Sequence, residues 1–223
     1  MHPSRVQAAG EALIEQGRRL GRQRLIAAAE GNLSVRLDAD RLLVTPGGQR
    51  KDELTTDDLV IVWLEHPDRE AHSPSGLLPT SDLAIHLAAY EARPEIAAFA
   101  HAHLPAAMAL TLAGEIPDPA ALPETAMLLP RLPFVSLGVP GSAELAARIA
   151  AALIEGPEPL AKAVLLERHG AVAVGDRPAQ AVDRLELVEV LCRTWRDALL
   201  IRAARAAVGI VSMPKQGSQP EGA

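Results

Sequence analysis

Strand-like segments in this chain follow one another through turns of only a few residues, which limits the sheets that it can form. Segments 34–37 and 41–44 flank Asp38-Ala39-Asp40 and predict a hairpin. Segments 163–166 and 171–174 likewise predict two strands joined by a short turn. Helical patterns lie before, between and after these pairs. The sequence therefore predicts a mixed sheet sandwiched by helices.

The expected helices begin at recognisable signals. Apolar residues recur at three- and four-residue steps over 4–21, and Thr80 or Ser81 is the expected cap of a helix that ends near 93. Further segments are listed in chain order: a strand at 59–64, a helix at 105–113, an irregular connection at 115–133, a short strand at 134–136, a helix at 142–154 and a helix at 178–207. Neither a repeat nor a linker divides the chain. We expect one domain over 1–212 and a mobile tail over 213–223.

Composition excludes several classes of protein. The net charge is −6 and the pI about 5.7, which argues against general nucleic-acid binding. No apolar run approaches the length of a membrane span, and the first residues have no apolar core of a signal peptide. The single cysteine, Cys192, cannot form an internal disulfide. We expect a cytoplasmic protein with no membrane partner.

Histidines provide the strongest chemical signal. His101 and His103 are two residues apart at the end of an apolar run, so in an extended segment both side chains lie on one side. His169 lies between two predicted strands and precedes Gly170, which permits close backbone approach. Three histidines at strand ends match a catalytic zinc site with one open position. The alternative is that the first two are loop-edge residues and the third a turn residue.

Other polar residues have two readings each. Asp82 is either a first-turn acid of a helix or a fourth metal ligand that also acts as a base. His86, one turn later, is either a packed residue or a partner of the metal ligands. Three small polar turns, at 31–34, 45–48 and 79–81, would form an anion nest if they converged.

Lysine occurs only at Lys51, Lys162 and Lys215. We expect Lys51 in a polar loop, Lys162 at the mouth of a strand and Lys215 in the tail. None lies in an apolar pattern that would depress the pKa of its amine, so an imine-forming lysine is not expected. The chain also has no dinucleotide fingerprint, which makes a nicotinamide enzyme improbable on sequence.

Taken together, these motifs resemble the class II aldolase/adducin family. The matching stretches are GNLSVR at 31–36, LLVTPGG at 42–48, PTSDLAIHLAAYEARPEIAAFAHAH at 79–103 and LLERHGAVAVG at 165–175. The resemblance covers about residues 5–205. It implies a three-layer α/β/α fold with a central, largely antiparallel sheet, usually assembled as a tetramer with active sites between subunits.

The resemblance also implies roles for individual residues. It makes His101, His103, His169 and Asp82 the metal ligands, with Asp82 also catalytic. The implied phosphate-binding residues are Gly31, Asn32, Gly47, Gly48, Thr80 and Ser81. The family's aldolases use a tyrosine from a neighbouring subunit as an acid, and the corresponding connection here has none. Glu124 in that connection is the candidate for a second catalytic acid or base, and a surface glutamate is the alternative reading.

The implied activity is cleavage of a sugar phosphate, a ketose 1-phosphate, by a metal-dependent aldolase that yields dihydroxyacetone phosphate and an aldehyde. One divalent ion per subunit, zinc or otherwise manganese or cobalt, would act as the Lewis acid. Alternatives on the same scaffold are a sugar-phosphate 4-epimerase, a phosphotetronate decarboxylase and a dehydratase. A non-catalytic, adducin-like assembly module is the alternative outside enzymes.

Overall fold

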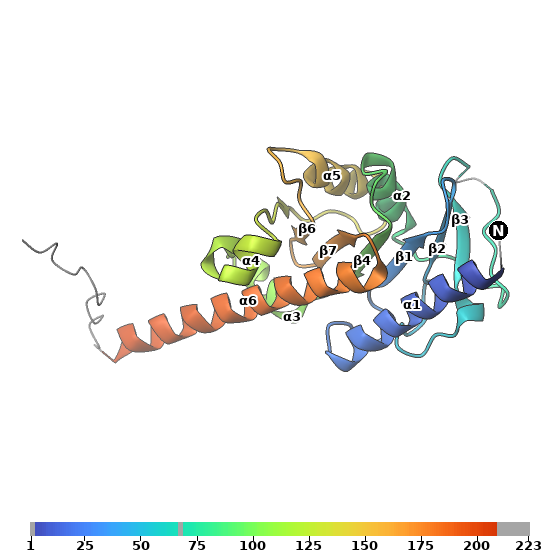
Figure 1. The fold of residues 1–223 in the computed structure, drawn as a ribbon. Coiled ribbons are helices and arrows are strands. Elements are labelled where there is room, and N and C mark those ends of the chain that lie inside the picture. Colours follow the sequence, from blue (N-terminus) through green and yellow to red (C-terminus); the bar gives the residue numbers. More distant parts are fainter. Residues whose placement is uncertain (1–2, 67–68, 209–223) are drawn as a thin grey trace, which may run out of the picture.

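One mixed sheet forms the centre of the molecule. A computed structural model describes residues 3–66 and 69–208, and within them seven strands are ordered β3-β2-β1-β4-β7-β6-β5 (Figure 1). Their bounds are β1 Asn32–Arg36, β2 Arg41–Val44, β3 Val60–Trp63, β4 Ala98–Ala102, β5 Phe134–Val135, β6 Ala163–Leu166 and β7 Gly170–Gly175. Both predicted strand pairs, β1–β2 and β6–β7, are present and antiparallel.

The register of the sheet places the histidine strand at its middle. β4 pairs antiparallel with β1 on one side and with β7 on the other, so His101 stands opposite Asn32 and Val172. Only the pairing of β5 with β6 is parallel among the described strands. The sheet is therefore largely antiparallel, as the family resemblance implied.

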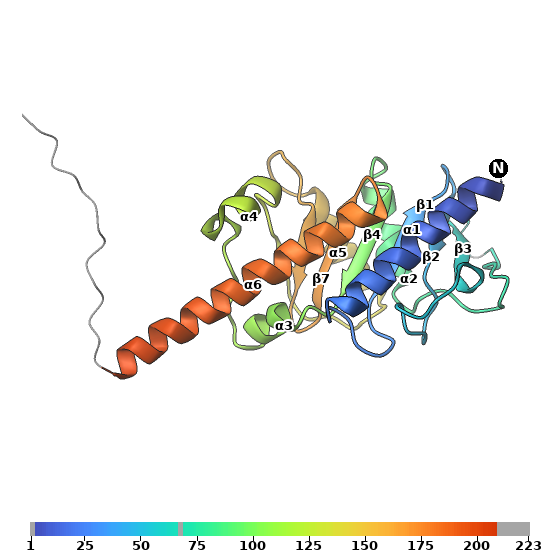
Figure 2. The same cartoon turned by 60° about the horizontal axis from the view of Figure 1, so that its bottom comes forward.

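Helices cover both faces of the sheet. They are α1 Pro3–Arg22, α2 Leu83–Ala92, α3 Pro105–Leu112, α4 Pro123–Leu128, α5 Ala143–Ile154 and α6 Pro178–Ala207. α1, α3 and α6 pack with one buried apolar cluster, and α2 and α5 pack with a second cluster on the opposite face. Figures 1 and 2 show these groups on either side of the strands. The three-layer α/β/α architecture follows from this division.

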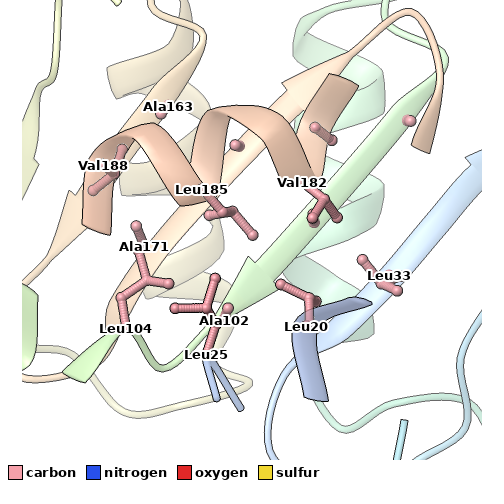
Figure 3. Packing of buried hydrophobic residues seen from close by; sticks show 14 of the residues in the cluster. Leu20, Leu25, Leu33, Ala102, Leu104, Ala163, Ala171, Val182, Leu185 and Val188 are labelled. Carbon is pink, nitrogen blue, oxygen red and sulfur yellow. The ribbon is translucent and has the colours of Figure 1, made fainter. Parts of the chain in front are cut away.

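The longest helix, α6, anchors the first face. Val182 and Leu185 are fully buried and face the sheet beside Ala102, with Leu20 from the end of α1 next to them (Figure 3). Fully burying an aliphatic side chain contributes about 1.5–3 kcal/mol. The sequence of α6 predicted this packing, and its bounds agree with the predicted helix 178–207.

Two details differ from expectation. The connection 115–133 is not wholly irregular, because Pro119 begins a 3-10 turn and Pro123 begins α4. The cap of α2 is Asp82 rather than Thr80 or Ser81, and Thr80 Oγ1 instead accepts a hydrogen bond from the Asp82 amide.

The predicted tail, 213–223, lies outside the described residues. No helix in the described ranges has the length and apolar character needed to cross a membrane.

Candidate active site

Three imidazoles meet at one end of the central strands. His101 is the fourth residue of β4, His103 follows this strand, and His169 lies in the turn between β6 and β7. Their ring centroids are 4.8–5.0 Å apart, and each offers a nitrogen within 4.8 Å of the others. The structure therefore brings together the three histidines that the sequence singled out.

The protonation of these rings suits a metal. His101 is fully buried, and its Nδ1 lies 3.0 Å from the Ala171 carbonyl, to which it must donate. Its Nε2 is buried and has no hydrogen-bond partner among the described residues, which costs about 1–3 kcal/mol unless something binds there. His103 Nδ1 lies 3.3 Å from Glu30 Oε1, the carboxylate contact typical of ligating histidines. These residues fit a divalent cation.

Burial keeps two of the imidazoles neutral. It holds the pKa of His101 well below its ordinary value, and the neighbouring His169 and His103 lower that pKa further. Burial is also the main reason for the lowered pKa of His169, with a further contribution from His103. Neutral imidazole is the form that binds a metal, so these two nitrogens are available at neutral pH.

Gly170 explains how the turn reaches the end of β4. Its φ is +88°, and a Cβ built there would stand 2.1 Å from the Ala102 carbonyl oxygen and 2.8 Å from the His103 Cα. Only glycine permits this approach. The contact carries His169, one residue earlier, to the other two histidines.

A pocket of about 410 Å³ adjoins the histidines, with His103 and His169 in its wall. All three polar turns contribute to it, through Gly31, Asn32, Gly47, Gly48, Thr80 and Ser81. The second and third turns are tied together, since the Gly47 amide donates to Leu78 O and the Thr80 amide to Thr45 O. The structure thus unites the six residues for which the resemblance implied phosphate binding.

Asp82 also lines this pocket, but it stands apart from the imidazole cluster. Among the described residues, the group with ligand atoms within 4.8 Å of one another comprises only the three histidines. Asp82 is nearly buried, and its Oδ2 accepts a hydrogen bond of 2.9 Å from Asn32 Nδ2. Its roles as metal ligand and base remain predictions.

A chain of buried hydrogen bonds fixes Asn32 behind Asp82. Because Asn32 Nδ2 donates to the carboxylate, its Oδ1 accepts from His86 Nε2 at 2.7 Å. Burial lowers the pKa of His86 to about 3, so the ring is neutral and its Nδ1 accepts from Ser34 Oγ at 2.7 Å. The Ser34 hydroxyl lies 3.1 Å from that of Tyr90, which is buried. His86 is therefore both a core residue and a partner of the site.

The prediction that the pKa of Lys51 is not depressed was wrong. This lysine is only 2% exposed and lines the pocket, and burial lowers the pKa of its amine to about 8 against the attraction of Asp82. The cause is tertiary. A Cβ at Gly17 of α1 would stand 2.2 Å from Lys51 O, so the glycine lets the loop lie directly on the helix. No apolar run in the local sequence signals this burial.

Glu124 is not in the pocket of its own chain. It lies exposed on α4, and the pocket wall does not include it. Its assignment as an acid therefore depends on a neighbouring subunit and stays a prediction.

Comparison with known families gives this geometry its context. The family model described as class II aldolase and adducin N-terminal domain matches residues 11–196. The chain belongs to the class II aldolase and adducin family.

Relatives within this family carry different activities. A 3-oxo-tetronate 4-phosphate decarboxylase of Haemophilus influenzae is 31% identical over 80% of this chain and 82% of its own length. A methylthioribulose-1-phosphate dehydratase of Acidiphilium cryptum is 30% identical over 80% and 85%. The crystal structure of L-fuculose-1-phosphate aldolase from Thermus thermophilus has a TM-score of 0.73 at 28% identity and covers 90% of this chain and 97% of that one. Family membership thus leaves the reaction open.

Proposed function

We propose that the chain is a metal-dependent aldolase that cleaves a ketose 1-phosphate by a retro-aldol reaction into dihydroxyacetone phosphate and an aldehyde. The observation that carries this proposal is the buried His101 Nε2, which has no partner among the described residues, within a three-histidine cluster beside a pocket lined by three small polar turns. Such a pocket accepts the two ends of a sugar phosphate, one at the cluster and one at the turns.

The residues around the pocket each have a role in this proposal. His101, His103 and His169 would hold one divalent ion, zinc or otherwise manganese or cobalt, and Asp82 would be its fourth ligand. When bound, the ion supplies Lewis acidity to the substrate's oxygens as the carbon–carbon bond breaks. Asp82 would also accept the proton of the substrate hydroxyl, held in place by Asn32. The glycine and hydroxyl turns would orient the phosphate group.

Decarboxylation of a phosphorylated oxo-acid is the second candidate. It is favoured by the similarity to the Haemophilus influenzae decarboxylase, and by the absence of tyrosine both from 115–141 and from the pocket wall of the described chain. Loss of carbon dioxide starts from a carboxylate, so it requires no proton transfer at a hydroxyl or aldehyde oxygen. A dehydratase or a 4-epimerase would use the same residues.

Metal content is the first test. We expect about one divalent ion per chain in the purified protein and less than a tenth of that in His103→Ala, because loss of one of three imidazoles leaves too few ligands. His72→Ala is the matched control, since His72 is exposed and away from the cluster. Elemental mass spectrometry before and after chelation measures both. Full metal content and turnover in His103→Ala would refute the assignment.

A substrate panel then separates the activities. Phosphorylated ketoses and oxo-acids are incubated with the metal-loaded protein, and the products are identified. Dihydroxyacetone phosphate supports the aldolase, carbon dioxide the decarboxylase, and inverted stereochemistry alone the epimerase. A protein that bound no metal and converted no substrate would favour an adducin-like assembly module.

The proposal includes a cytoplasmic homotetramer. The single cysteine, Cys192, is a buried free thiol on α6, in keeping with the proposed cytoplasmic location. Glu124 would act across a subunit boundary, as the family tyrosine does in aldolases. The exposed apolar residues at the end of α6 support assembly.

A further inference from the structure

Basic side chains are scarce in the wall of this pocket. Its wall includes glycine and hydroxyl turns together with Asn32, two acidic residues, Glu30 and Asp82, and two of the histidines. Within the part of the chain that the structure describes, Lys51 is the one lysine or arginine in that wall. Glu30 faces His103, whereas Lys51 belongs to the loop that follows the Gly47–Gly48 turn.

Lys51 also connects two of the three turns. Its Nζ donates to the Ala29 carbonyl at 2.8 Å and to the Gln49 carbonyl at 2.5 Å. Ala29 lies two residues before Gly31, and Gln49 directly follows Gly48. The amine therefore holds the first and second turns at a fixed separation.

These contacts require a donor. Both partners are carbonyl oxygens, which only accept, and an ammonium has three donors. Two are used, and the third is available to a ligand in the pocket. The same arrangement opposes a nucleophilic role, because an imine or iminium nitrogen keeps at most one N–H and could not donate to both carbonyls.

We propose that Lys51 is the charged element of a phosphate-monoester subsite: it clamps two turns together and pairs with the dianion that they cradle. This inference rests on the proposed function, because it concerns the phosphate end of the same substrate. Neutral donors alone bind many anions weakly, whereas a buried ammonium favours the doubly charged one. Lys51 would thereby select phosphorylated over unphosphorylated sugars.

The test uses inorganic phosphate and the full chain after removal of metal, so it is independent of turnover. Isothermal titration at constant ionic strength compares the natural protein with Lys51→Met and Lys51→Arg. We expect roughly ten-fold or greater weakening in Lys51→Met, the loss of one charge-assisted hydrogen bond, and partial recovery in Lys51→Arg. Lys162→Met is the matched control, because Lys162 lies outside the pocket wall, and its affinity should be unchanged.

A second measurement avoids variants at the site. Because the chain has only three lysines, ¹³C-lysine labelling gives three side-chain signals, and Lys162→Arg and Lys215→Arg identify Lys51 by elimination. Phosphate should shift the Lys51 signal and leave the other two in place.

Equal phosphate affinity in Lys51→Met, no phosphate binding by the natural protein, or an unmoved Lys51 signal at saturating phosphate would each overturn the inference. Failure of the proposed function looks different: phosphate would bind through Lys51, but no metal would bind and no substrate would react.

Discussion

At the scale of single residues, Gly170 holds the third histidine in place although it has no side chain of its own. Its φ of +88° and the 2.1 Å approach of a hypothetical Cβ to Ala102 O mean that two separate costs oppose any other residue. One cost is the left-handed backbone, and the other is the collision with β4. Gly114 allows the two costs to be measured separately. Its φ is +78°, but a Cβ there would meet no atom within 4 Å, so only the backbone cost applies.

We therefore expect Gly170→Ala to lower the free energy of unfolding by about 2–5 kcal/mol, and Gly114→Ala by only about 1–2 kcal/mol. Urea unfolding of the two variants measures the difference. Metal affinity should fall in Gly170→Ala alone, since only that turn carries His169. Equal destabilisation of both variants would show that the close approach contributes nothing.

Some residues of the site were predictable from the sequence and others were not. His101, His103 and His169 were predictable as a cluster because strand ends and a glycine turn have local signals. The three polar turns also have local signals, whereas it was the resemblance that singled out the six turn residues, and only the fold brings them to one pocket. Lys51 was not, because its burial depends on Gly17, a residue of α1 far away in the chain.

At the scale of elements, α3 supports two of the histidines together. It begins two residues after His103, and its Thr111 Oγ1 accepts a hydrogen bond of 2.9 Å from the Arg168 amide, next to His169. Its own first turn is held from a distance: the buried Glu189 carboxylate of α6 accepts from the amides of Ala106 and Ala107. A carboxylate at a helix N-terminus is favourable in both charge and hydrogen bonding.

Removing this remote cap should loosen α3. We expect Glu189→Ala to cost about 2–3 kcal/mol of stability, since the buried amides of Ala106 and Ala107 lose their carboxylate acceptor and Arg193 loses its ion pair. Metal affinity should fall roughly ten-fold or more through displaced histidines.

Glu186→Ala is the matched control for Glu189. Glu186 lies on the same helix, and its ion pair with Arg19 is part-exposed, so about 1 kcal/mol or less is expected. Thermal unfolding and metal titration measure both variants. Unchanged metal affinity in Glu189→Ala would show that α3 does not position the histidines.

Elements were the most predictable level of this molecule. All predicted strands and helices formed, because hydrophobic periodicity, helix-starting prolines and the Ser142 cap are local signals. The exception, α4, lies in a proline-rich stretch that suggested irregular chain. There Pro119 and Pro123 begin short helical turns instead of interrupting them. The capping of α3 by Glu189 has no local signal at all.

At the scale of the whole molecule, α6 extends beyond the sheet. Its buried residues end at Cys192, and both views show the remaining turns projecting from the body (Figures 1 and 2). Leu200 and Ile201 on this half are 62% and 54% exposed. Exposed apolar residues on a protruding helix are the feature from which we propose that another copy of the chain packs here.

We expect the double substitution Leu200→Glu and Ile201→Glu to reduce the mass of the assembly in sedimentation velocity, because charges would replace apolar contacts. The control is Arg202→Glu with Arg205→Glu, which alters charge on the same exposed half but leaves its apolar residues intact. A monomeric natural protein, or an assembly unaffected by the double substitution, would contradict this expectation.

The antiparallel centre of the sheet has a further consequence, for how this scaffold can diversify. In a parallel sheet, the functional loops all follow strands. Here β4 runs toward the site and β7 runs away from it. The same pair of hydrogen-bonded strands therefore places His103, which follows β4, beside His169, which precedes β7. The turns at 45–48 and 79–82 are separate segments attached to that frame. A change in these turns can therefore alter the polar contacts at one end of the pocket while the strands that position the histidines keep their pairing.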